Sequence, residues 1–92
     1  MKDLNQIEEK IKILKGWSFN SEKNCLEKEY LFKSYLKNIN FVNAIAWIAN
    51  KENHHPDLEI SFGKCIVRIS THDENKITQK DFDLAQKINE LE

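Results

Sequence analysis

The feature that most limits the fold is a long segment of helical periodicity that ends just before the only proline. Apolar residues recur at alternating spacings of four and three from Tyr35 to Ala49, which is typical of one face of an α-helix. Ser34 precedes this segment and is a favoured N-cap residue, whereas Pro56 disfavours the α conformation in the residue before it. We therefore predict a helix over residues 34–53, about 30 Å long, followed by extended chain.

This helix is apolar over more than half of its circumference from residue 41 onward. Phe41, Ile45 and Ile48 widen the apolar face, and Ala44 and Trp47 add a further strip beside it. A helix that is so broadly apolar is usually buried on two sides. We therefore expect it to be the core helix, and its surface is also compatible with a subunit contact.

The rest of the chain shows shorter helical patterns and short segments in which apolar and polar residues alternate, as in strands. One helix is predicted over residues 3–15, closed by Gly16, and another from the capping-box sequence Thr78-Gln79-Lys80-Asp81 onward. Strands are predicted near residues 17–19, 25–33, 58–62 and 65–72. The order α-β-β-α-β-β-α indicates one α+β domain spanning residues 1–92. We predict a four-stranded antiparallel sheet with three helices packed on one face.

Composition narrows the function classes. The 92 residues carry a net charge of −1, which gives no electrostatic reason to expect nucleic acid or an anionic membrane as a partner. No apolar run approaches the roughly 20 residues needed to span a bilayer, and no apolar segment typical of a secretory signal follows the N-terminus. Cys25 and Cys65 form no CxxC motif, so we expect two buried thiols in a reducing, cytoplasmic protein.

The three histidines are expected to meet at one corner of the sheet. Antiparallel pairing about a turn at Gly63 places residues opposite each other when their numbers add up to about 126, as those of His54 and His72 do. His55 lies beside them through its peptide bond to His54. The predicted cluster is next to the C-terminal end of the long helix.

Such a cluster has three interpretations. Three imidazoles can bind zinc, although the side chains of adjacent histidines diverge and no cysteine lies nearby in the sequence. Histidine also suits acid–base catalysis, because its ordinary pKa lies nearest neutrality. The third interpretation is structural, in which His54 caps a helix and His72 ends a strand. The residue pattern alone leaves all three open.

The spacing of these residues resembles the pterin-4a-carbinolamine dehydratase family over nearly the whole chain. The resemblance is carried by His54-His55-Pro56, the aromatic Phe62, Thr71-His72, Asp81 nine residues after His72, and Trp17 after Gly16. It implies a lyase without a cofactor or metal, which removes water from 4a-hydroxytetrahydropterin (4a-hydroxytetrahydrobiopterin) to give quinonoid dihydropterin. Such enzymes serve tetrahydrobiopterin recycling after an aromatic amino acid hydroxylase has turned over.

The resemblance also implies roles for individual residues. The catalytic residues would be His54, His55 and His72, and the pterin would be bound by His54, His55, Pro56, Thr71, His72, Asp73 and Glu74. Trp17, Asn50 and Asp81 are possible supporting residues. The capping box alone explains Asp81, Trp17 suits the core, and we expect Arg68 and Lys80 to be solvated. Asn50 departs from the family, because many members carry a carboxylate there, and a neutral amide removes negative charge near the histidines.

Two further functions are compatible with the same sequence. Some members of the family also act as dimerisation partners of a transcription factor, so an oligomeric interaction module of the coactivator type is one alternative. The other is a related pterin-binding protein that acts on a different pterin. The expected partners are a small pterin substrate and further copies of the chain, in a homodimer or homotetramer.

Overall fold

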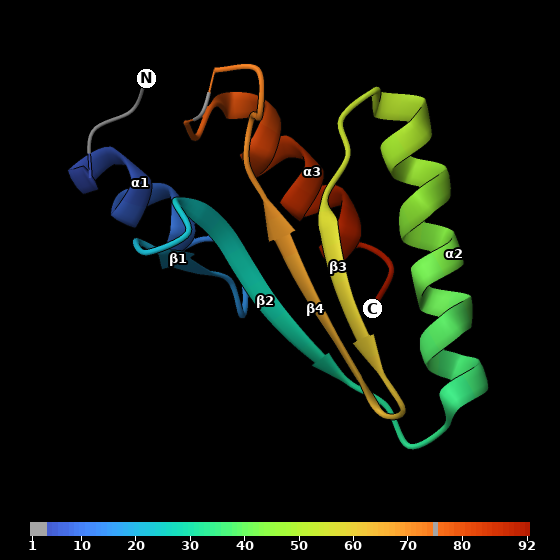
Figure 1. Ribbon diagram of the computed structural model, residues 1–92. Coiled ribbons are helices and arrows are strands. Elements are labelled where there is room, and N and C mark those ends of the chain that lie inside the picture. The colour runs from blue at the N-terminus through green and yellow to red at the C-terminus, as the bar shows by residue number, and fades with distance from the viewer. Residues whose placement is uncertain (1–3, 75) are drawn as a thin grey trace.

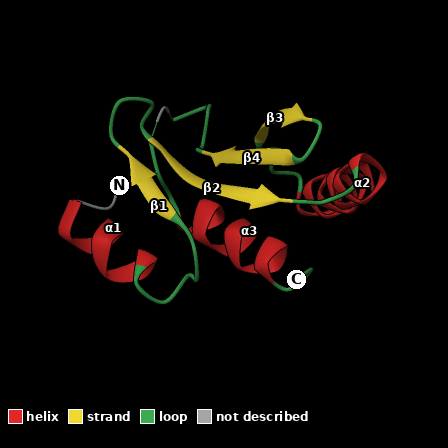
Figure 2. Ribbon diagram, turned by 90° about the horizontal axis from the view of Figure 1, so that it is seen from below, coloured by secondary structure: helices red, strands yellow, loops and turns green. Residues whose placement is uncertain are grey.

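The structure is a computed structural model that describes residues 4–74 and 76–92. The elements within these residues are α1 (Leu4–Ile11), β1 (Ser18–Asn20), β2 (Cys25–Leu31), α2 (Tyr35–Glu52), β3 (Asp57–Ser61), β4 (Lys64–Ile69) and α3 (Gln79–Asn89) (Figure 1). The strands form one antiparallel sheet in the order β1-β2-β4-β3. All three helices lie on the same side of this sheet (Figure 2). The predicted α+β class and element order are thereby confirmed.

The alternation of side chains along β2 separates the core from the open face of the sheet. Leu26 and Tyr30 are buried toward the helices, whereas Glu29 is exposed on the opposite face. Pairing of β2 with β4 joins the two hairpins into one sheet. The core between sheet and helices includes the fully buried side chains of Leu26, Ile45, Val67, Ile69, Ile77, Leu84 and Ile88.

The first helix is shorter than predicted. It ends at Ile11, and residues 12–16 continue as turns in which the Leu14 N–H donates to the Ile11 carbonyl at 2.9 Å. Gly16 has a φ of +84°, a conformation that glycine adopts without steric cost. The glycine therefore closes this turn region and not the helix itself. The predicted start at residue 3 lies outside the described residues.

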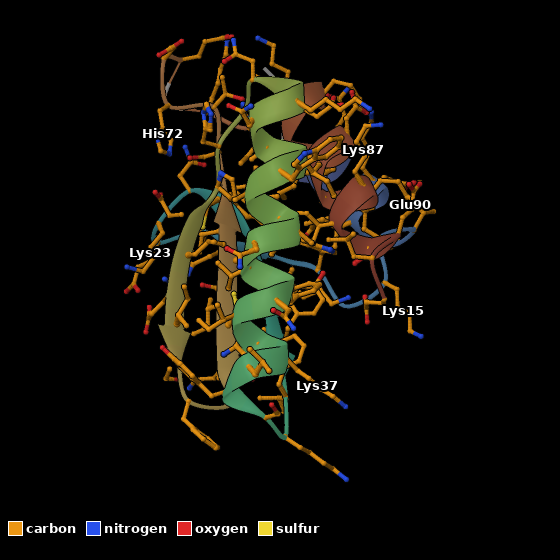
Figure 3. All side chains as sticks on the ribbon, turned by 90° about the vertical axis from the view of Figure 1, so that its right-hand side faces the viewer. Lys15, Lys23, Lys37, His72, Lys87 and Glu90 are labelled. Atoms are coloured by element: carbon orange, nitrogen blue, oxygen red, sulfur yellow. The ribbon has the colours of Figure 1, made fainter. Side chains whose placement is uncertain are left out.

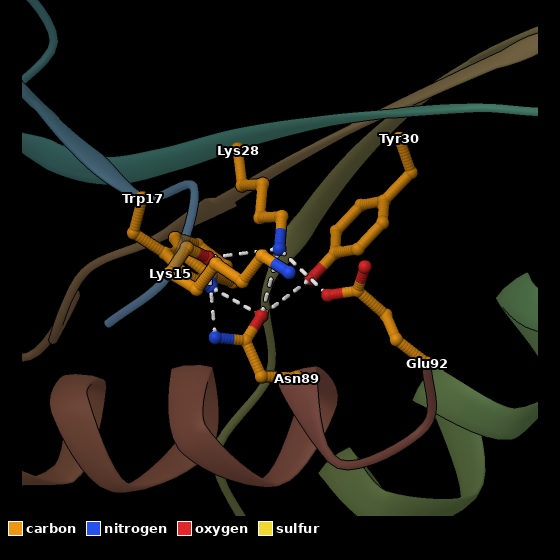
Figure 4. Close-up of polar contacts among 6 residues, drawn as sticks. All are labelled: Lys15, Trp17, Lys28, Tyr30, Asn89 and Glu92. Carbon is orange, nitrogen blue, oxygen red and sulfur yellow. Dashed lines mark hydrogen bonds and ion pairs between the residues drawn. The ribbon is translucent and has the colours of Figure 1, made fainter. Parts of the chain in front are cut away.

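A buried lysine ties the turn after α1 and the C-terminal end of the chain to the middle of β2 (Figure 4). Lys28 Nζ donates to the Lys15 carbonyl at 2.9 Å, to Asn89 Oδ1 at 2.9 Å and to Glu92 Oε2 at 2.7 Å. Asn89 Oδ1 also accepts from Trp17 Nε1 and from the Tyr30 hydroxyl. Burial raises the pKa of Tyr30 far above its ordinary value, so its hydroxyl stays protonated and donates. The network fixes α3 and the turn before β1 against the sheet.

The expectation that α2 is buried on two sides is wrong for the single chain. Its buried residues are Asn38, Ile45 and Ala49. Leu36 and Trp47 are 68% and 67% exposed. The helix covers the sheet on one side, beside β3 and β4 (Figures 1 and 2), and leaves an apolar surface uncovered.

The second hairpin differs from the prediction by a one-residue slip. Leu58 pairs with Val67 and Ile60 with Cys65, so paired residue numbers add up to 125. The last strand ends at Ile69 and not at residue 72. His54 and His72 nevertheless emerge at the same open end of the hairpin, where both line one pocket.

Both cysteines are free and buried, as predicted. Burial raises the pKa of the Cys25 and Cys65 thiols, which makes them poor nucleophiles near neutral pH. Among the described residues, no helix is both long and apolar enough to cross a membrane.

Candidate active site

The C-terminal end of α2 directs His54 away from the helix. Asn53 follows the last helical residue in the left-handed conformation, with φ 53° and ψ 41°, a region that asparagine visits more readily than most residues. The His54 N–H then donates to the Ala49 carbonyl at 3.1 Å, which caps the helix in the manner of a Schellman motif. Pro56 follows in extended chain and leads into β3. These steps fix where the backbone of His54 lies.

A buried carboxylate fixes the His54 side chain. His54 Nε2 lies 2.6 Å from Asp81 Oδ1, and the two side chains are 12% and 0% exposed. Asp81 Oδ2 accepts from the Thr78 N–H at 2.7 Å and from the Thr71 hydroxyl at 3.0 Å. The positive end of the α3 dipole also favours a negative charge at this position. Asp81 therefore acts as an acceptor on both oxygens.

This arrangement selects one form of the His54 ring. A carboxylate oxygen accepts, so His54 Nε2 carries the proton of the 2.6 Å contact. Nδ1 is then the ring nitrogen that can take up or release a proton during a reaction. Asp81 thus has two tasks, because it completes the predicted capping box with Thr78 and also orients His54, which follows the end of α2.

His72 reaches the same region from the turn after β4. The turn is closed by a bridge between Thr71 and Lys76, in which the Thr71 N–H donates at 2.9 Å. The His72 side chain is 59% exposed, and its Nε2 lies 3.5 Å from Asp57 Oδ2. Figure 3 shows His72 at the end of the molecule where α2 terminates, far from Lys37 near the start of that helix.

Residues from these two segments, together with Lys80 of α3, line a pocket of about 320 Å³. Its lining consists of Asn53, His54, His55, Pro56, Asp57, Ser70, Thr71, His72, Asp73 and Lys80. All three histidines belong to it, together with the predicted Pro56, Thr71 and Asp73. The structure thus brings together the two halves of the expected site.

Four predicted site residues lie outside this lining. Glu74 is exposed in the turn after His72 and pairs with Lys76 at 3.1 Å. Asn50 is exposed on α2. Trp17 is 5% exposed in the core and donates to Asn89. Asp81 stands behind the pocket, where it holds His54.

Sequence reasoning missed two charged residues of the lining. Lys80 was expected to be solvated; it is exposed, as expected, but it also lines the pocket. Asp57 was given no role, although it directly follows Pro56 and opens the strand that leads away from His54. Its position beside the histidine pair is the signal that could have identified it.

Metal ligation was one interpretation of the histidine cluster. Among residues 4–74 and 76–92, no group of three or more His, Cys, Asp or Glu side chains is arranged to hold a metal ion. The absence of a metal from the site stays a prediction.

Comparisons with known proteins find similarity over nearly the whole chain. A family model described as pterin 4 alpha carbinolamine dehydratase matches residues 3–91. A Sulfolobus acidocaldarius protein that carries the provisional name pterin-4-alpha-carbinolamine dehydratase is 39% identical over 90 residues, covering 98% of this chain and 97% of its own. A Sulfurisphaera tokodaii protein with the same provisional name is 43% identical over 86 residues, covering 94% and 90%.

A solved structure shares the fold. The crystal structure of a transcriptional coactivator/pterin dehydratase from Brucella melitensis superposes with a TM-score of 0.91 at 26% identity, covering 98% of this chain and 96% of the other. The similarity therefore extends over both hairpins and all three helices.

Proposed function

Because this chain belongs to the pterin 4 alpha carbinolamine dehydratase family, we propose that it eliminates water from a 4a-hydroxytetrahydropterin by histidine acid–base catalysis. The observation that carries the proposal is the placement of His54 and His72 on one pocket, each with a carboxylate at Nε2. The pocket volume of about 320 Å³ suits a small bicyclic ligand, since ligand sites begin at roughly 300 Å³.

The reaction needs two proton transfers and no electron transfer. A base removes the proton on N5 of the pterin, and the electron pair released forms the N5–C4a double bond as the C4a–O bond breaks. An acid protonates the departing hydroxyl, which leaves as water. The product is the quinonoid dihydropterin, and exchange with solvent restores the protonation of both protein groups. Histidine can serve in either role near neutral pH.

The structure suggests how the proposed histidines share this work. His54 exchanges its proton through Nδ1, and Asp81 faces the positive charge that develops on the ring when Nδ1 is protonated. His72 lies at the exposed side of the pocket, where it can exchange protons with water. His55 and Pro56 are proposed to contact the pterin, together with Thr71 and Asp73.

The proposed physiological role is tetrahydrobiopterin recycling without a cofactor or metal. A related pterin remains the alternative substrate, because the pocket residues that contact the bicyclic ring would bind either pterin. The discriminating observation is the relative kcat/KM for 4a-hydroxytetrahydropterins that differ only in the C6 side chain.

The direct test is a stopped-flow measurement of the dehydration of synthetic 4a-hydroxytetrahydropterin. We expect a rate that rises in proportion to protein concentration above the spontaneous rate, and that EDTA does not change. A rate equal to the spontaneous one at every protein concentration would reject the dehydratase proposal. Loss of rate with EDTA would instead reassign the site to metal chemistry.

We further propose that the chain self-associates through α2 and the adjacent β3–β4 turn, as a homodimer or homotetramer. Tyr35, Leu36, Trp47 and Phe62 are between 52% and 69% exposed, and the rings of Tyr35 and Phe62 stack with centroids 6.3 Å apart. Exposed apolar side chains that gather on one surface mark interaction sites, and the Tyr35–Phe62 pair forms such a surface at the start of α2. The Brucella structure is described as a transcriptional coactivator/pterin dehydratase, which supports an interaction module of the coactivator type as the alternative function.

Substitution of this surface is expected to change the oligomeric state. The double variant Leu36→Ser and Trp47→Ser should elute as a monomer in size-exclusion chromatography with light scattering, whereas the wild type should elute as a dimer or tetramer. Ile13→Ser is the matched control, because Ile13 is 83% exposed on the turn after α1. A monomeric wild type at high micromolar concentration would contradict the proposal.

A further inference from the structure

We propose that Asp57 is a positioning residue for His72, which holds the imidazole through Nε2 so that Nδ1 is presented to the substrate. The inference rests on the proposed dehydratase function and extends it to a residue outside the predicted site. In this role Asp57 exchanges no proton with the pterin itself. Its effect on the rate would pass through the orientation of His72.

The backbone brings the two side chains together from neighbouring segments. Asp57 is the first residue of β3, directly after Pro56, and His72 lies in the turn after β4. The distance from His72 Nε2 to Asp57 Oδ2 is 3.5 Å, which is an ion-pair separation. Both residues line the same pocket. The pair therefore joins the two segments of the pocket, the one that follows α2 and the one that follows β4.

The most obvious competing cation is already engaged. Arg68 is the ladder partner of Asp57 in the β3–β4 pair. Its guanidinium instead binds Glu27 through Nε at 2.6 Å and Glu59 through Nη1 at 2.9 Å. The carboxylate of Asp57 is consequently left for the histidine at the end of the sheet.

Other charged groups face the same pocket without replacing Asp57. Asp73 follows His72 in the chain, and Lys80 lines the pocket from the first turn of α3. In the described part of the chain, Asp57 is the carboxylate that lies within ion-pairing distance of the His72 ring.

The pair uses the same atoms as the pair formed by His54 and Asp81 but is looser, because its N–O distance is 3.5 Å and that of the hydrogen-bonded His54–Asp81 pair is 2.6 Å. In both pairs a carboxylate approaches Nε2, so the same ring nitrogen, Nδ1, is left for the substrate. The pairs differ in burial, because Asp81 is 0% and Asp57 71% exposed. Water and salt weaken an exposed pair, so Asp57 is expected to contribute less than Asp81.

The kinetic test compares Asp57→Ala with the conservative Asp57→Glu and with Glu59→Ala. Glu59 is a matched control, because it lies on the same strand and the same sheet face but binds Arg68. We expect kcat to fall about two- to fivefold in Asp57→Ala, the range of an exposed ion pair, with KM unchanged. Asp57→Glu should restore most of kcat, and Glu59→Ala should match the wild type. Equal kcat in Asp57→Ala and Glu59→Ala would overturn the inference.

A second measurement needs no substrate and separates this inference from the dehydratase proposal. Long-range ¹H–¹⁵N NMR spectra report which ring nitrogen of neutral His72 carries the proton. We expect the Nε2–H form to predominate in the wild type and in Glu59→Ala, and to decrease in Asp57→Ala. An unchanged His72 tautomer ratio in Asp57→Ala would overturn the positioning role. An inactive wild type would reject the dehydratase proposal alone. The NMR comparison would still show whether Asp57 sets the tautomer of His72.

Discussion

Asp81→Asn is expected to lower the dehydration rate by about 100-fold to 10,000-fold, the range that positioned acid–base groups contribute. The amide oxygen can still accept from the Thr78 N–H and the Thr71 hydroxyl, as Oδ2 does now. The amide NH₂ then points at His54 Nε2, which must become an acceptor. The proton moves to Nδ1, so the ring presents the wrong nitrogen to the substrate.

This prediction is measured as kcat/KM together with the free energy of unfolding. Asp83→Asn is the matched control, because Asp83 is an exposed residue of the same helix that accepts from Gln79 Nε2. Retained activity in Asp81→Asn, in a variant that remains folded, would show that the carboxylate does not orient His54.

Ile45→Ala is expected to destabilise the fold by about 2–5 kcal/mol, the usual cost of removing most of a fully buried branched side chain. Ile45 is 0% exposed and is one of the few residues that anchor α2 to the core. A small domain has a total stability of roughly 5–15 kcal/mol. The loss would therefore be a large fraction of the total, and it would loosen the helix that ends at His54.

Urea denaturation followed by circular dichroism checks this value. Ile13→Ala removes the same atoms from a side chain that is 83% exposed and should stay within about 0.5 kcal/mol of the wild type. A similar loss of stability in both variants would mean that Ile45 does not anchor the helix to the core.

Local patterns predicted the elements that depend on neighbouring residues. Ser34 caps α2, and the left-handed Asn53 with Pro56 ends it, as N-cap preference and the effect of proline indicate. The strand predicted near residues 25–33 corresponds to β2, which spans Cys25–Leu31. The histidine cluster was also predictable, because a hairpin turn sets which residues emerge at its open end.

Contacts between distant segments were not predictable from the same patterns. The capping box accounts for Asp81 within α3, but its contact with His54 depends on how the start of α3 packs against the end of α2. The one-sided burial of α2 could not be deduced either, because a core face and an association face have the same composition. The pairing of β2 with β4 likewise depends on the packing of the whole domain.

The measurement that tests the central claim most directly is the dehydration rate of a synthetic 4a-hydroxytetrahydropterin with the wild type, His54→Ala and His72→Ala. We expect each substitution to lower kcat by about 100-fold or more, as loss of a positioned acid or base does, while the fold stays intact. Unchanged rates in both variants, at a wild-type rate above the spontaneous one, would contradict histidine acid–base catalysis at this pocket.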